Sequence, residues 1–317
     1  MKVLVITNMY PNNTKPYFGV FVKEHIESLE KMGCTCDIVN IIPPKAGGTY
    51  ANYFISYLKL LYRRLVKRYD VVYCQHAFCV LLARFALFRN LIYVNHEGEF
   101  FRRSSIERVK DFAVKSSQKI IFVNKDMYDH FNKVMPSKKY LFQPFGVNYS
   151  KFEFIEKEDA RAILGLNSKH VLFFPADPAR EEKGFNTLEK FTEEQRNYIS
   201  TNDIAVLVGG SIEYNKMRLY FYASDLVVSC SNFESDGLVY KESIACGRKF
   251  ISPNVGNANF YASYNDSYIY NSYDDFESLI KEHFEKEDSF SGKLERVIVD
   301  DFSVEVSSKN ILNFLRS

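Results

Sequence analysis

The chain has 317 residues, 46% of them hydrophobic, which suffices for two domains of about 150 residues with a core each. Its 41 basic and 39 acidic residues leave a formal net charge of +2, a balance that does not favour nucleic acid as a partner. The longest apolar stretches, such as 77–88, fall short of the roughly 18 residues of a membrane span. The first apolar run ends at Asn8 and Pro11, too early for a signal peptide, so we expect a cytoplasmic protein.

Short apolar runs alternate with helical patterns in the first half of the chain. Runs of this length between helices indicate strands buried on both faces, and therefore a parallel sheet. We expect strands at 2–7, 36–42, 70–76, 91–98 and 119–124, and helices at 20–32, 53–69 and 126–134.

Pro144 and Gly146 interrupt this rhythm, and we place a domain boundary near 146–158. Alternating order then resumes, which predicts an α/β chain of two Rossmann-like, doubly wound parallel-sheet domains, 1–150 and 151–317, facing a central cleft. The last helix could pack back on the first domain. The expected strands are 170–176, 204–210, 225–230 and 249–252, and the expected helices are 158–166, 186–196, 213–223, one from 238 to Gly247, and the terminal segment 307–317.

Several common kinds of site lack their motifs. The chain has no G-x-G-x-x-G for a nicotinamide cofactor and no G-x-x-x-x-G-K-[ST] phosphate loop. It also lacks the G-x-S-x-G of a hydrolase elbow, and a D-x-D triplet for a metal-bridged nucleotide sugar. Its six cysteines form no C-x-x-C pair and no Cys/His cluster with metal-ligand spacing. We therefore expect no metal, no cofactor and no disulfide scaffold.

The segment FESDGLVYKESIACG carries two acids, Glu234 and Glu242, with Gly237 between them. A helix is expected to start near Gly237, where free backbone N–H groups and the helix dipole favour a phosphate. Glu242 could accept hydrogen bonds from a ribose, and Glu234 from hydroxyls at the other end of a ligand. Alternatively, Glu242 only stabilises the helix start and Glu234 is a solvated loop acid; spacing alone leaves both interpretations open.

The same segment resembles the E-x7-E signature of retaining glycosyltransferases with two Rossmann-like domains, the GT-B fold, and specifically of glycosyltransferase family 4. The resemblance extends along most of the chain, and the sub-pattern is similar to that of bacterial enzymes of teichuronic acid and surface polysaccharide synthesis. It is carried further by ITNMYPNNTKPYFGVFVKEHIESLEKMG, YDVVYCQH, YVNHEGEF, QPFGVNYSKF, FFPADPAREEKGF and NVGN.

The resemblance implies roles for nine residues. Glu242 would bind the ribose, Glu234 would sit beside the donor sugar, and the diphosphate would lie against the backbone at the start of the helix. The basic residues would neutralise the diphosphate without a metal. From the residues alone, a solvated charge run and a structural histidine are the plainer interpretations of the basic pair and of His96. The implied catalytic residues are Glu234, Arg180, Lys183 and His96, and the implied donor-binding residues are Gly19, Gly237, Leu238, Val239 and Glu242.

By resemblance, the expected activity is transfer of a sugar, with retention, from a nucleotide-diphosphate donor such as a UDP-sugar. The expected acceptor is a glycan or a polyprenyl-linked molecule. The alternatives are a nucleotide-sugar epimerase of the same architecture and a non-catalytic nucleotide-sugar-binding partner of another transferase.

The expected helix 53–69 is both basic and amphipathic. Its apolar positions are Phe54, Tyr57, Leu58, Leu61 and Leu65. Such a helix could lie on an anionic leaflet at the inner face of the cell membrane, or it could be an ordinary surface helix with its apolar stripe against the sheet.

Overall fold

The computed structural model describes residues 1–16, 18–96, 107–286 and 301–317. These residues divide into two compact units. The first unit consists of Met1–Gly146 together with Val304–Ser317, and the second of Val147–Ser303. The expected second domain, 151–317, thus includes a C-terminal segment that belongs to the first unit.

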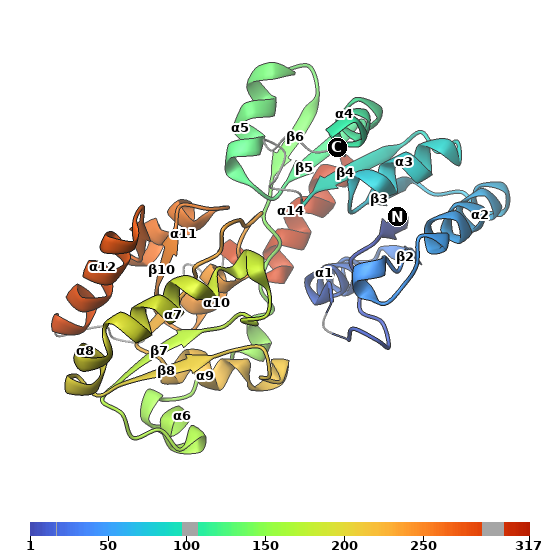
Figure 1. Cartoon of the computed structure of the whole chain (residues 1–317). Coiled ribbons are helices and arrows are strands. Elements are labelled where there is room, and N and C mark those ends of the chain that lie inside the picture. The colour runs from blue at the N-terminus through green and yellow to red at the C-terminus, as the bar shows by residue number, and fades with distance from the viewer. Residues whose placement is uncertain (17, 97–106, 287–300) are drawn as a thin grey trace. The chain divides into compact units, whose positions relative to one another are not determined.

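The first unit is built on a parallel sheet, coloured from blue to green in Figure 1. Its strand order is β2-β1-β3-β4-β5-β6. Its strands are β1 Lys2–Thr7, β2 Thr35–Asn40, β3 Val71–Cys74, β4 Leu91–Asn95, β5 Lys119–Phe122 and β6 Lys139–Phe142. Its helices are α1 Val20–Lys31, the 3-10 turn η1 Pro44–Ala46, α2 Ala51–Val66, α3 Ala77–Phe85, α4 Glu107–Ser116, α5 Lys125–Val134 and α14 Val304–Arg316.

Helices cover both faces of this sheet, because successive strand side chains point to opposite sides. Val3 and Val5 of β1 pack with apolar residues of α1 and α14. Leu4 and Ile6 pack on the other face with residues of α2, α3 and α5. Both faces of β1 are therefore apolar, as expected for a buried parallel strand.

The C-terminal helix α14 is held on the first unit by polar contacts as well as by its apolar face. His25 Nδ1 lies 2.8 Å from Ser308 Oγ, and its Nε2 lies 3.2 Å from Tyr73 Oη. The backbone N–H of Gly146 donates to Ser307 Oγ at 3.0 Å, and Lys119 Nζ donates to the carbonyl of Phe314 at 2.7 Å. Helix α14 thus belongs to the first unit although it follows the second unit in the sequence.

The second unit has a parallel sheet with the strand order β11-β10-β9-β7-β8. Its strands are β7 His170–Phe174, β8 Ile204–Val208, β9 Leu226–Val228, β10 Lys249–Pro253 and β11 Tyr268–Tyr270. Its helices are η3 Tyr149–Lys151, α6 Lys157–Leu164, η4 Glu181–Lys183, α7 Phe185–Glu194, α8 Arg196–Thr201, η5 Tyr214–Lys216, α9 Met217–Ala223, α10 Leu238–Ala245, α11 Ala258–Asn265 and α12 Tyr273–Glu285. One face packs on α7 and α12, and the other on α6, α9, α10 and α11.

The predicted α/β class with two parallel sheets is confirmed, and each expected strand is present within a few residues. Residues 97 and 98 of the expected strand 91–98 lie outside the described residues. The α-helices and strands that sequence patterns did not predict are α3, α4, β6, α8, α11, β11 and α12. Strands β6 and β11 are short and lie at sheet edges, where side chains are half-exposed and the apolar pattern is weak.

Among the described residues, no helix combines the length and apolar character needed to cross a bilayer.

Candidate functional site

A pocket of about 180 Å³ lies in the second unit where β7 and β9 end. Phe174 closes β7 and Val228 closes β9, so the pocket lies at the carboxyl edge of the sheet, where α/β domains place their ligands. Five of the nine sequence-predicted residues line it. Its lining residues are Phe174, Pro175, Ala176, Arg180, Lys183, Met217, Val228, Ser229, Ser231, Glu234, Val239 and Glu242.

Lys183 and Glu234 form an ion pair inside this pocket. Their side chains are only 17% and 15% exposed. The same carboxylate oxygen of Glu234 accepts a hydrogen bond of 2.8 Å from Ser231 Oγ. Glu234 is therefore a fixed acceptor with a cation beside it, rather than a solvated loop acid.

Two glycines allow the segments that carry this pair to approach one another closely. Gly184 has φ 64°, and a Cβ there would lie 2.1 Å from the carbonyl oxygen of Cys230. A Cβ at Gly256, which has φ 61°, would lie 2.8 Å from Cβ of Glu234. The turn after η4 and the turn after β10 thus both pack closely on the loop 230–234, which helps to fix the position of Glu234.

Arg180 lines the same pocket but is much more exposed. Its Nε and Nη2 donate to Glu182 Oε1 at 2.9 and 2.6 Å, and both side chains are about half exposed, at 55% and 52%. The hydrogen bonds from Arg180 lower the pKa of Glu182. An exposed pair of this kind contributes little to stability, so Arg180 can exchange its partner for a ligand anion at little cost.

Helix α10 begins at the pocket with Gly237 as its N-cap. Gly237 has φ 89°, and a Cβ there would lie 2.1 Å from Cε2 of Tyr240. The Tyr240 ring is fully buried, and its hydroxyl lies 2.8 Å from Ser252 Oγ, so the ring is enclosed and held at its hydroxyl end. Leu238 and Val239 form the first turn, where backbone N–H groups have no acceptor within the helix. Their amides are suited to bind an anion.

Glu242 lies one helical turn beyond Leu238 and lines the pocket with a half-buried side chain. It shares the pocket with Glu234, the other acid of the E-x7-E segment. The spacing therefore brings both carboxylates to one pocket, on either side of the start of α10.

A buried polar network that the sequence did not reveal holds the loop before α10. Asp236 accepts hydrogen bonds from Lys241 Nζ at 2.6 Å, Asn257 Nδ2 at 2.7 Å and Tyr261 Oη at 2.7 Å. The side chain of Lys241 is fully buried. The only sequence signal was Lys241, which lies in a short helix five residues after Asp236. Hydrophobic periodicity does not show that such a lysine is buried.

Gly19 and His96, the two remaining predicted residues, belong to the first unit. Gly19 is the N-cap of α1 with φ 73°, and a Cβ there would lie 2.4 Å from the carbonyl group of Met9. His96 follows β4, its Nε2 lies 2.7 Å from Gln75 Oε1, and its ring packs edge-on against Phe145 at 4.9 Å. Each lies at the carboxyl end of a strand or in the loop that follows it.

The pocket of the second unit has the chemistry of an anion site with polar acceptors on both sides. It offers two cations and a helix start for negative charge, and two carboxylates for hydroxyl groups. Within the described ranges no group of three or more His, Cys, Asp and Glu side chains is placed to bind a metal ion.

No model of a known protein family matches the chain, and no curated protein matches its sequence. Solved structures do match over nearly the whole length. Sucrose-phosphate synthase (tll1590) from Thermosynechococcus elongatus is similar with a TM-score of 0.78 and 14% identity, over 99% of this chain and 98% of that one. Anabaena Alr3699/HepE in complex with UDP and glucose is similar with a TM-score of 0.73 and 14% sequence identity, over 100% of both chains. A glycosyltransferase from Rickettsia africae ESF-5 is similar with a TM-score of 0.71 and 15% sequence identity, over 99% of this chain and 97% of that one. The chain therefore has the GT-B fold of two Rossmann-like units.

Proposed function

We propose that this protein is a glycosyltransferase that moves a sugar from a nucleotide-diphosphate donor, a UDP-sugar in the first instance. The observation that carries the proposal is the pocket of the second unit, where Lys183, Glu234 and Glu242 meet at the start of α10. The solved structures of the same fold support it, since they include a glycosyltransferase and complexes with UDP and UDP-glucose.

Each side chain of the pocket has a role in this proposal. Glu242 accepts hydrogen bonds from the ribose hydroxyls, and the first-turn amides of Leu238 and Val239 donate to the diphosphate. Arg180 and Lys183 neutralise the diphosphate, so no metal ion is required. Glu234 accepts hydrogen bonds from hydroxyls of the donor sugar.

The ion pair between Lys183 and Glu234 links the residue proposed to bind the diphosphate to the residue proposed to bind the donor sugar. A carboxylate beside the cation fixes the ammonium group before the donor arrives. When a diphosphate binds, Lys183 can contact a phosphate oxygen while it keeps Glu234 as a neighbour. Charge then builds up on the departing diphosphate next to a cation that is already in position, which favours the transition state over the ground state.

The reaction that we propose proceeds with retention on one face of the donor sugar. The acceptor hydroxyl oxygen bonds to the anomeric carbon as the bond from that carbon to the diphosphate oxygen breaks, and the leaving diphosphate takes the acceptor proton. By the same resemblance, Gly19 would let its loop approach the phosphates, and His96 would lie near the donor sugar. The acceptor is a glycan or a lipid-linked saccharide of surface polysaccharide synthesis, by analogy with family 4.

A screen of nucleotide sugars tests the proposal. A ligand that binds the native state raises the unfolding temperature, so thermal shifts across uridine and guanosine nucleotide sugars identify the donor. Transfer is then measured with saccharide acceptors, and the anomeric configuration of the product is read by NMR. Release of an altered nucleotide sugar without any acceptor would instead indicate an epimerase. Binding without any turnover of the purified protein, with every acceptor class supplied, would favour a non-catalytic partner.

A further inference from the structure

Helix α2 in the first unit exposes a row of large apolar side chains to solvent. Phe54, Leu58, Tyr62 and Leu65 recur at intervals of three and four residues and so share one face of the helix. We call this face, with its neighbours Ile55 and Val66, the outer row. Its side chains are exposed as follows: Phe54 63%, Ile55 47%, Leu58 49%, Tyr62 66%, Leu65 85% and Val66 54%.

The outer row is not needed to hold α2 on the sheet. The opposite side of the helix packs through the buried Leu60 and Ser56, and through half-buried Tyr53, Tyr57 and Leu61. The apolar stripe expected from the sequence thus splits: Tyr57 and Leu61 face the core, whereas Phe54, Leu58 and Leu65 face outward. A contiguous apolar face of this kind marks an interaction surface.

The charge of this segment is one-sided although the whole chain is nearly balanced. Residues 51–68 contain five basic side chains and no acidic one, whereas the chain has 41 basic and 39 acidic residues. The basic residues are Lys59, Arg63, Arg64, Lys67 and Arg68. A partner with both an apolar interior and a negative surface fits this combination.

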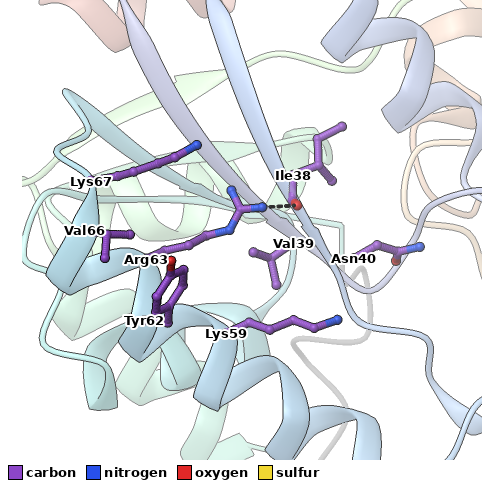
Figure 2. Close-up of a pocket in the computed structure, with 8 residues that line it drawn as sticks. All are labelled: Ile38, Val39, Asn40, Lys59, Tyr62, Arg63, Val66 and Lys67. Carbon is purple, nitrogen blue, oxygen red and sulfur yellow. Dashed lines mark hydrogen bonds between the residues drawn. The ribbon is translucent and has the colours of Figure 1, made fainter.

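A hollow of about 390 Å³ lies beside the outer row, between α2 and β2. Figure 2 shows Lys59 and Arg63 of α2, and Lys67 just after the helix, around this hollow, with Arg63 donating to the carbonyl of Ile38. Tyr62 and Val66 of the outer row complete its wall. The hollow thus joins three cations to the edge of an apolar surface.

These three cations are only partly neutralised within the protein. Arg63 and Lys67 share one carboxylate, that of Asp37, at 3.3 and 2.8 Å. Lys59 forms no ion pair with any residue that the structure describes. The hydrogen bonds from Lys67 and Tyr69 lower the pKa of Asp37, which therefore stays ionised, and the hollow keeps a net positive charge.

We propose that α2 lies in the headgroup region of a bilayer that contains anionic phospholipid, with the outer row in the acyl boundary and one lipid phosphate in the hollow beside Lys59. Interfacial helices combine such an apolar face with flanking lysine and arginine, and tyrosines such as Tyr50 and Tyr62 are common at that depth. The basic excess favours a lipid surface over a second copy of this chain, since two copies would bring like charges together. The proposal does not depend on the sugar-donor pocket.

Vesicle co-sedimentation of the full chain tests this proposal without any sugar donor. Wild-type protein is expected to bind vesicles of phosphatidylcholine with phosphatidylglycerol about tenfold or more tightly than phosphatidylcholine alone, and less tightly at high salt. The double variant Leu58→Glu/Tyr62→Glu should lose this binding. Its matched control, Val134→Glu, alters another apolar side chain of the first unit that is 59% exposed, and should bind as wild type does.

A second pair of variants tests the hollow. Lys59→Glu should weaken binding to the anionic vesicles severalfold, whereas Lys133→Glu, an exposed lysine on α5, should not. Circular dichroism and the unfolding temperature establish that each variant is folded. The proposal is overturned if folded Leu58→Glu/Tyr62→Glu still binds anionic vesicles, or if wild-type protein binds none. It is also overturned if light scattering shows a dimer that the double variant dissociates, which would assign the outer row to a second copy.

Discussion

Lys183 and Glu234 lie 51 residues apart in the sequence, yet they form an ion pair at the carboxyl edge of the second sheet. Lys183 comes from the turn before α7, and Glu234 from the loop after β9. The pair links the basic element that follows β7 to the acidic segment that leads into α10. It gives a physical reason why a nucleotide-sugar site would need both segments.

Replacing Lys183 with alanine should lower turnover far more than it lowers donor affinity. If Lys183 stabilises charge that develops on the leaving diphosphate, we expect kcat to fall by about 10²–10³-fold, because that charge is largest in the transition state. Steady-state kinetics with the donor found by the thermal screen measure the effect. Lys183→Arg should recover part of the rate, and Lys190→Ala, an exposed lysine on α7, should keep all of it. Equal rates for Lys183→Ala and wild type would remove Lys183 from the mechanism.

Glu242 is expected to recognise the ribose, and a ligand series can isolate that contact. Glu242→Ala should weaken binding of UDP by about 10²-fold or more, the cost of two lost hydrogen bonds to a charged group at about 1.5–3 kcal/mol each. The same variant should bind 2′,3′-dideoxy-UDP as well as wild type does, because that ligand lacks the hydroxyls in question. Calorimetric titration of both ligands with both proteins gives the coupling free energy. Equal losses for the two ligands would mean that Glu242 acts elsewhere.

Gly237 should be needed for the shape of the helix start. In Gly237→Ala the new Cβ meets the buried Tyr240 ring and φ stays at 89°, so the first turn of α10 must shift. We expect a loss of donor affinity of about tenfold or more in a protein that still folds. Gly165→Ala is the matched control, since Gly165 also has positive φ, at 67°, but its Cβ would meet no described atom within 4 Å. The control should show a small loss of stability and normal donor binding in the same titration.

Breaking the buried pair of Lys241 and Asp236 should strongly destabilise the second unit. Lys241→Ala leaves an uncompensated carboxylate in the interior, and removing one partner of a buried pair costs about 3–5 kcal/mol. Urea unfolding measures the change. Lys216→Ala, which breaks an exposed pair with Glu213 in the same unit, should cost less than about 1 kcal/mol. Similar losses for both variants would show that burial is not what matters at Lys241.

His25 should make the first unit sensitive to acid. Burial lowers its pKa to about 3, whereas an unfolded chain has a histidine pKa of about 6.5. Between these values the unfolded state binds a proton that the folded state does not. His25 therefore leaves the free energy of unfolding unchanged above about pH 6.5 and lowers it progressively as the pH falls toward 3. From pH 7.5 to pH 5 the expected loss is about 2 kcal/mol. His25→Gln should show a shallower pH dependence of the unfolding free energy, and an unchanged slope would contradict the assignment.

The sequence was sufficient for the overall class because the strands are buried on both faces. Runs such as 2–7 and 170–176 are almost wholly apolar, and only a parallel sheet covered by helices on both sides buries them. It was less informative at sheet edges. Strand β6, with the sequence KYLF, is half-exposed and only four residues long, too short for a periodic pattern to identify it as a strand.

The sequence by itself determined the two-unit α/β organisation and the approach of Glu234 and Glu242 to one helix start, because both depend on local periodicity and on the geometry of one strand, loop and helix. Only the tertiary structure decided the partners. Lys183 and Arg180 are three residues apart, yet one is enclosed beside Glu234 and the other is exposed beside Glu182. Likewise, which side of α2 meets the sheet depends on the packing of Leu60, and that packing leaves the outer row in solvent. Long-range contacts set both outcomes, and local sequence does not encode them.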